Sequence, residues 1–148
     1  MVVDPVPPLP AKRQEAEALF AAHGGSVTFR ASLDAAEEEG LTPPYDAATS
    51  SLTLCSVADP VDTLRDLSSL LKPGAPYAFV EHVQSNDGFF RLQQRAFDPL
   101  QQLVANGCHL QRRSQDDIAA WFSKVEFNRS FEEEMWPVSE QINGIAFN

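Results

Sequence analysis

The stretch that decides the fold is residues 45–83, which read YDAATSSLTLCSVADPVDTLRDLSSLLKPGAPYAFVEHV. Two almost uncharged runs, 45–57 and 76–83, lie at its two ends. Short apolar runs bounded by turn residues predict buried strands, and continuous burial is typical of a parallel sheet that is covered on both faces. We therefore expect these two runs to be neighbouring parallel strands of one sheet.

The segment between the two runs predicts a helix. Asp59 and Pro60 have the residue types of an N-cap and a first-turn proline, and leucines follow at helical spacing. The pattern ends at Lys72-Pro73-Gly74, which is a turn sequence. Residues 45–83 thus predict a strand, a crossover helix and a second strand.

Upstream, the chain repeats this alternation of strands and helices. An apolar start at 1–3 and the alternating run 26–31 predict strands, and 11–23 predicts a helix that ends at Gly24-Gly25. Glycine pairs at this position commonly cap a helix at its C-terminus. This part of the chain therefore predicts a further unit in which a helix connects two strands.

Downstream, residues 86–107 carry a mixed helical pattern that we expect to break at Asp98-Pro99. A further helix is expected to begin at Ser114. The alternating runs 124–131 and 142–147 have no helix between them, which predicts an antiparallel hairpin. The whole pattern predicts an α/β domain with a mostly parallel sheet and a C-terminal hairpin.

Composition limits the class of protein. The 148 residues are 43% apolar, enough for a single domain over 1–148. With 11 Lys and Arg against 21 Asp and Glu, the formal net charge is -10, which repels nucleic acid. No apolar run is long enough to insert into a membrane, and only two cysteines are present. We expect a cytoplasmic protein with no nucleic-acid partner.

The cysteines predict neither a metal site nor a reactive thiol. Cys108 and His109 are adjacent, but the chain has no pair of ligands at zinc-finger spacing. Cys55 lies in an apolar run with no charged neighbour in the sequence, which favours a small buried packing residue over a nucleophile. We therefore predict no bound metal.

In open α/β sheets, ligands bind outside the carboxyl ends of the strands. The candidate binding residues therefore follow the predicted strands, and they are Asp4, the segment 32–38, the segment 55–57, and Glu81-His82. An acid at a strand end commonly accepts hydrogen bonds from ribose hydroxyls, although an Asp-Pro pair is also typical of a simple turn. Histidine titrates near neutral pH, so His82 is the candidate base, with a backbone-bonding histidine as the alternative.

Read in order, several short motifs resemble the class I S-adenosylmethionine-dependent methyltransferases, and more narrowly the thiol methyltransferases called methyltransferase-like 7 proteins. The motifs are Val2-Val-Asp-Pro5, Leu54-Cys-Ser-Val57, Leu71-Lys-Pro-Gly74, Glu81-His-Val83, Phe97-Asp-Pro99, Asn106-Gly-Cys108 and Ile142-Asn-Gly-Ile-Ala146. The resemblance implies a Rossmann-like seven-stranded sheet with a terminal antiparallel hairpin. It also implies S-adenosylmethionine as the cofactor and a small-molecule acceptor, for which a thiol is the candidate.

Carried over by position, the resemblance makes Asp4 the ribose-binding acid and places Asp34 near the adenine, with Glu37 as the alternative. Leu54, Cys55 and Ser56 would line the cofactor. His82 would assist removal of the acceptor's proton, because a thiol reacts as its thiolate. These assignments are expectations that follow from the resemblance.

The resemblance also leads us to expect that the chain lacks the family's first strand and glycine-rich loop. On that expectation, the chain binds the cofactor weakly or not at all. The alternative to an active methyltransferase is a truncated or degenerate domain, which would be an interaction module or the product of an incomplete gene model. A dinucleotide-dependent oxidoreductase shares the sheet and the ribose acid, but the Leu71-Lys-Pro-Gly74 turn and the hairpin favour methyl transfer.

Overall fold

The computed structural model describes residues 2–3, 9–26, 28–30 and 42–148. The chain forms two compact units, Met1–Thr42 and Pro43–Asn148. In the first unit, a helix connects two short parallel strands, and the elements are β1 (Val2–Val3), α1 (Pro10–Ala22) and β2 (Phe29–Arg30). The guanidinium of Arg13 on α1 lies 5.4 Å from the centre of the Phe29 ring. The predicted helix over 11–23 is confirmed.

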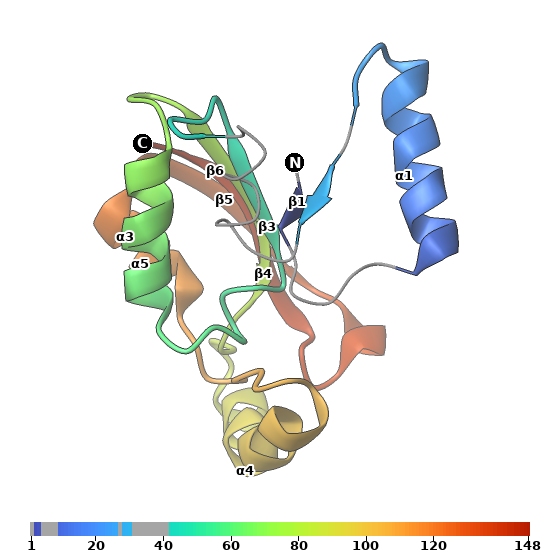
Figure 1. The fold of residues 1–148 in the computed structure, drawn as a ribbon. Coiled ribbons are helices and arrows are strands. Elements are labelled where there is room, and N and C mark those ends of the chain that lie inside the picture. The colour runs from blue at the N-terminus through green and yellow to red at the C-terminus, as the bar shows by residue number, and fades with distance from the viewer. Residues whose placement is uncertain (1, 4–8, 27, 31–41) are drawn as a thin grey trace. The chain divides into compact units, whose positions relative to one another are not determined.

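The second unit contains a four-stranded sheet with the order β3-β4-β6-β5 (Figure 1). Strands β3 and β4 are parallel, whereas β6 runs antiparallel to both β4 and β5. The predicted C-terminal hairpin is confirmed. The elements of this unit are β3 (Ala48–Ser51), α3 (Pro60–Leu70), β4 (Pro76–His82), α4 (Gly88–Val104), α5 (Ser114–Trp121), β5 (Ser123–Phe131), the short helix η1 (Glu133–Met135) and β6 (Glu140–Phe147).

Helices α3 and α5 pack against each other on one side of this sheet (Figure 1). The predicted N-cap of α3 is confirmed, because the Asp59 carboxylate accepts hydrogen bonds from the backbone amides of Val61 and Asp62 at 2.8 and 3.1 Å. The apolar core lies between the helices and the sheet. It contains Leu54, Leu64, Leu71, Ala75, Tyr77, Phe79, Val83, Ile118, Phe122, Ile142 and Ala146.

Within residues 43–148, helices cover one face of β3 and β4, whereas the sequence predicted that both faces are covered. Along β4, Tyr77 and Phe79 are buried in the core, whereas Val80 is 40% exposed. Strand β3 contains no fully buried residue. Within residues 43–148, α3 and α5 lie against one face, so successive residues of β4 alternate between buried and exposed positions.

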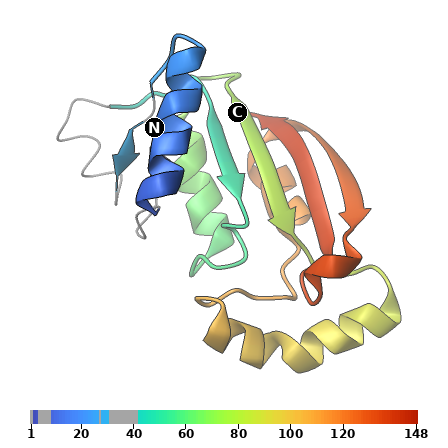
Figure 2. The ribbon, with the colours of Figure 1, turned by 90° about the vertical axis from the view of Figure 1, so that its right-hand side faces the viewer.

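Helix α4 crosses the end of the sheet at which β3 and β4 finish (Figure 2). It continues through Pro99, so the predicted break at Asp98-Pro99 is wrong. A proline inside a helix removes one backbone hydrogen bond. Here the helix is stabilised at its start, because the Asp87 carboxylate accepts hydrogen bonds from the amides of Phe89 and Phe90. Among the described helices, none is long and apolar enough to cross a membrane.

Candidate functional site

The site begins at the turn that follows β3. The strand ends at Ser51, and Leu52 has a positive φ of 52°, which turns the chain out of the extended conformation. The amides of Ser56 and Val57 then donate hydrogen bonds to the carbonyl of Thr53 at 2.9 and 3.2 Å. The prediction of a strand continuing to Val57 is therefore wrong, and residues 52–57 form a tight turn, which we call the β3 turn.

Glu81, near the end of β4, binds the β3 turn from one side. Its carboxylate accepts hydrogen bonds from the amides of Thr53 and Leu54 at 3.3 and 3.1 Å, and from the Ser50 hydroxyl at 2.7 Å. The residue is fully buried. Burial raises the pKa of the Glu81 carboxyl, while these hydrogen bonds act in the opposite direction. Glu81 therefore positions the turn from within the sheet.

Arg112 binds the same turn through its carbonyls. Its guanidinium donates hydrogen bonds to the carbonyl oxygens of Leu54 and Val57 at 2.7 and 2.6 Å. The amide of His109 donates to the carbonyl of Cys55 at 2.8 Å. The β3 turn is thus held through its amides by β4 and through its carbonyls by the segment that follows α4.

These contacts bring three buried side chains together. The ligand-type atoms of Cys55, His82 and Cys108 all lie within 4.8 Å of one another. His82 Nε2 lies 2.9 Å from Cys108 Sγ. The exposed fractions are 2% for Cys55, 1% for His82 and 6% for Cys108. His82 therefore contacts a cysteine, rather than the backbone as the alternative interpretation expected.

The two thiols of this cluster differ in acidity. A hydrogen bond with Cys108, together with burial, raises the pKa of the Cys55 thiol. The same hydrogen bond lowers the pKa of Cys108, which is the acceptor. The single S–H proton of Cys55 has a second possible acceptor in the carbonyl of Leu52, 3.3 Å from Sγ. Cys55 is buried as predicted, but its surroundings are polar.

Sequence reasoning missed this cluster because its members are far apart along the chain. Cys55 and His82 are separated by 82 - 55 = 27 residues, and His82 and Cys108 by 26. One lies in the β3 turn, one ends β4, and one follows α4. The only available signal was that the first two follow predicted neighbouring parallel strands, whose carboxyl ends meet at one edge of a sheet.

The predicted cofactor residues have different positions. Leu54 and Cys55 are buried, so of the predicted triplet only Ser56 is exposed. The backbone of Leu54 already binds Glu81 and Arg112. Asp4 and Asp34, together with the alternative Glu37, lie outside the described residues.

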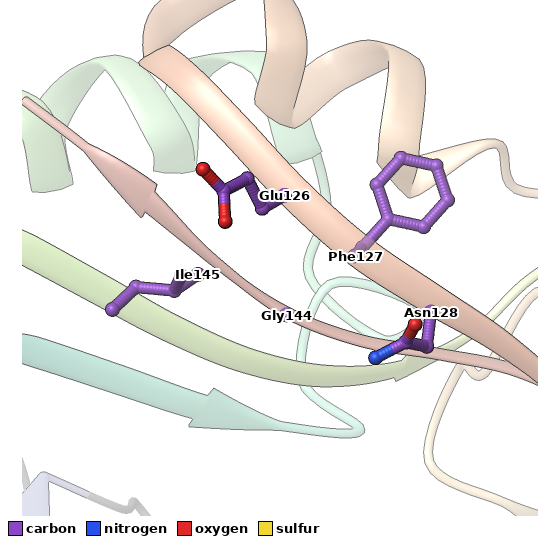
Figure 3. A pocket seen from close by; sticks show the side chains of 5 residues that line it. All are labelled: Glu126, Phe127, Asn128, Gly144 and Ile145. Atoms are coloured by element: carbon purple, nitrogen blue, oxygen red, sulfur yellow. The ribbon is translucent and has the colours of Figure 1, made fainter.

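A separate hollow of about 310 Å³ lies on the hairpin (Figure 3), lined by Glu126, Phe127, Asn128, Gly144 and Ile145. A side chain at Gly144 would place its Cβ 2.2 Å from the Glu126 carbonyl oxygen. Glycine is thus required by the close approach of β5 and β6. This hollow shares no residue with the β3 turn or the cysteine and histidine cluster.

Comparison with known proteins identifies the family. A family model described as "Methyltransferase domain" matches residues 1–129. The chain belongs to the methyltransferase domain family. The parallel β3 and β4, the crossover helix and the terminal hairpin agree with the class I methyltransferase fold that the sequence motifs implied.

Relatives of this methyltransferase-domain chain include thiol S-methyltransferases. It is 36% identical over 104 residues to Thiol S-methyltransferase TMT1B of Rattus norvegicus, and 33% identical over 104 residues to the TMT1B protein of Homo sapiens. Each alignment covers 68% of this chain and 43% of the relative. The matched segment thus spans less than half the length of these curated relatives.

A similar fold occurs among solved structures. An O-methyltransferase family protein from Burkholderia thailandensis matches with a TM-score of 0.55 and 17% sequence identity. The match covers 92% of this chain and 41% of that chain. At this identity the likeness shows the fold alone, and it agrees with the class I methyltransferase architecture.

Proposed function

We propose that this methyltransferase-domain chain transfers a methyl group from S-adenosylmethionine to a small thiol. The observation that carries the proposal is the 36% identity to a protein named as a thiol S-methyltransferase, over 68% of this chain. The geometry supports it, since the β3 turn lies at the carboxyl end of a parallel strand, where ligands bind in open α/β sheets.

Ser56 is the residue of the β3 turn that we assign to the cofactor. Its side chain is exposed, while the neighbouring Leu54 and Cys55 anchor the turn in the interior. When bound, S-adenosylmethionine supplies a methyl group on a sulfonium that is already a good leaving group. The role of the protein is then mainly to hold cofactor and acceptor in line. Glu81 and Arg112 contribute by keeping the turn in one conformation. Asp4 and Asp34 remain proposed contacts to the ribose and adenine.

A thiol acceptor requires little help with its proton. Thiols have a pKa of about 8.5, so a few per cent is thiolate near pH 7. His82 remains the proposed base, and its ring is 1% exposed in this structure. If it acts as the base, His82→Gln lowers kcat/KM and removes a limb of its pH profile. An unchanged profile would overturn that role.

A direct assay tests the function. The full chain is incubated with methyl-labelled S-adenosylmethionine and either a small alkyl thiol or the matching alcohol as control. We expect label in the thioether product of the thiol and none in the ether. Label transferred to neither acceptor, from a chain shown to be folded by circular dichroism, would overturn the proposal and favour the non-catalytic interaction module.

A further inference from the structure

Among the described residues, Cys55 and Cys108 lie beside His82 in a buried cluster, and methyl transfer gives neither thiol a chemical role. Methyl transfer from a sulfonium needs no metal, and of the predicted cofactor residues 54–56 the exposed one is Ser56. The cluster instead places two sulfur atoms and an imidazole nitrogen in the interior, within 4.8 Å of one another.

We propose that Cys55, His82 and Cys108 bind a thiophilic divalent cation, with Zn²⁺ as the expected ion. The donor set favours this class of metal, because thiolate sulfur and imidazole nitrogen are the ligands that zinc prefers, and carboxylate oxygen is the ligand of magnesium and calcium. The inference does not depend on the proposed methyl transfer.

The geometry is close to that of a zinc site. Zinc–sulfur bonds of about 2.3 Å and zinc–nitrogen bonds of about 2.0–2.1 Å separate the ligand atoms of a tetrahedral site by about 3.6–3.8 Å. In this structure His82 Nε2 and Cys108 Sγ are 2.9 Å apart, and all three ligand atoms lie within 4.8 Å of one another. Movements of about 1 Å or less therefore bring the three side chains to bonding positions.

The backbone around the cluster is already fixed by other contacts. The β3 turn is held by Glu81 and Arg112, and the amide of His109 donates to the carbonyl of Cys55 at 2.8 Å. The segment after α4 is held by Asp98, whose carboxylate accepts from the Leu110 amide at 2.6 Å. A cation would thus bind to side chains whose main-chain positions are set independently of it. With three protein ligands, water or an added donor fills the fourth position.

A metal-binding measurement tests this inference without any assay of activity. The full chain is reduced, treated with a chelator, incubated with Zn²⁺ and freed of excess ion, after which zinc and protein are quantified. Co²⁺ is titrated in parallel, because thiolate-to-cobalt charge transfer reports sulfur ligation. We expect about one equivalent of zinc per chain and a cobalt–thiolate absorption band.

Variants assign the ligands. Cys55→Ser, His82→Gln and Cys108→Ser should each weaken Co²⁺ binding by more than about tenfold, a loss that even an outer-sphere change can produce. His109→Gln is the matched control, since His109 is adjacent to Cys108 and its side chain is 40% exposed. It should bind as the unchanged chain does. Thermal melting in the presence of chelator checks that each variant is folded, and added Zn²⁺ should raise the Tm of the unchanged chain and of His109→Gln only.

Several results would overturn the inference. They are zinc binding well below one equivalent by the folded unchanged chain, a cobalt spectrum without thiolate bands, and loss of binding in His109→Gln but not in Cys108→Ser. Recovery of a Cys55–Cys108 disulfide in place of bound metal after preparation under reductant would also overturn it. None of these readouts involves S-adenosylmethionine, so failure here is distinguishable from failure of the proposed function.

Discussion

Strand β4 contributes to two regions that are stabilised by different forces. Tyr77 and Phe79 lie in the apolar core under α3 and α5, where their rings are 5.7 Å apart. Two residues after Phe79, Glu81 holds the β3 turn through hydrogen bonds, and the next residue, His82, forms a hydrogen bond with Cys108. Apolar burial is non-directional and depends on volume, whereas a buried polar network depends on the identity of each partner. The core should therefore respond to lost volume, and the β3 turn to the loss of a single donor or acceptor.

The largest expected loss of stability comes from removing a side chain of the apolar core. Phe79→Ala should lower the free energy of unfolding by about 3–5 kcal/mol, because it removes a buried ring and leaves a cavity. Val80→Ala is the matched control on the other face of the same strand, where Val80 is 40% exposed, and it should cost less than about 1 kcal/mol. Urea unfolding followed by circular dichroism measures both. Equal losses would mean that both faces of β4 are buried.

The second largest expected loss of stability comes from the hydrogen bonds that hold the β3 turn. Arg112→Met should cost about 2–3 kcal/mol, because it keeps the apolar stem but removes charged donors from the carbonyls of Leu54 and Val57. The neighbouring Arg113 has a side chain that is 64% exposed and pairs with Asp116, so Arg113→Met should change stability by less than about 0.5 kcal/mol. The same unfolding measurement applies. A cost for Arg113→Met as large as that for Arg112→Met would contradict the role given to Arg112.

The smallest expected loss of stability comes from the N-cap of α3, a contact between residues that are neighbours in the sequence, unlike the contacts of Arg112. Asp59→Ala removes the N-cap of α3 and should cost about 1 kcal/mol. Asp66→Ala, at an exposed position in the same helix, should cost about 0.5 kcal/mol or less. Differential scanning calorimetry resolves the two shifts in Tm. If removing the cap costs more than Arg112→Met, the β3 turn is not the stronger polar anchor.

The elements that could be predicted from the sequence are those whose signals are local. The N-cap and leucine spacing of α3, the apolar run of β4 and the alternation in the hairpin each lie within a short segment. The length of β3 could not be predicted, because the turn after Ser51 depends on Glu81 and Arg112 from other parts of the chain. The same reason explains why Cys55 appeared to be a packing residue.

The local sequence also could not predict that α4 continues through Pro99. Pro99 is locally a helix breaker, yet α4 runs from Gly88 to Val104 with Pro99 inside it. The preceding Asp98 accepts a hydrogen bond from the Leu110 amide, which joins the middle of the helix to the chain that follows it.

One measurement tests most directly the central claim that the β3 turn binds the cofactor. The ¹⁵N-labelled chain is titrated with S-adenosylmethionine, and backbone amide shifts are followed by NMR. We predict weak but saturable shifts at Cys55, Ser56 and Val57, in line with the low affinity expected from the sequence, and none at the hairpin hollow of residues 126–128 and 144–145 (Figure 3). Shifts confined to the hairpin hollow, or no saturable shift at any amide of the folded chain, would contradict the claim.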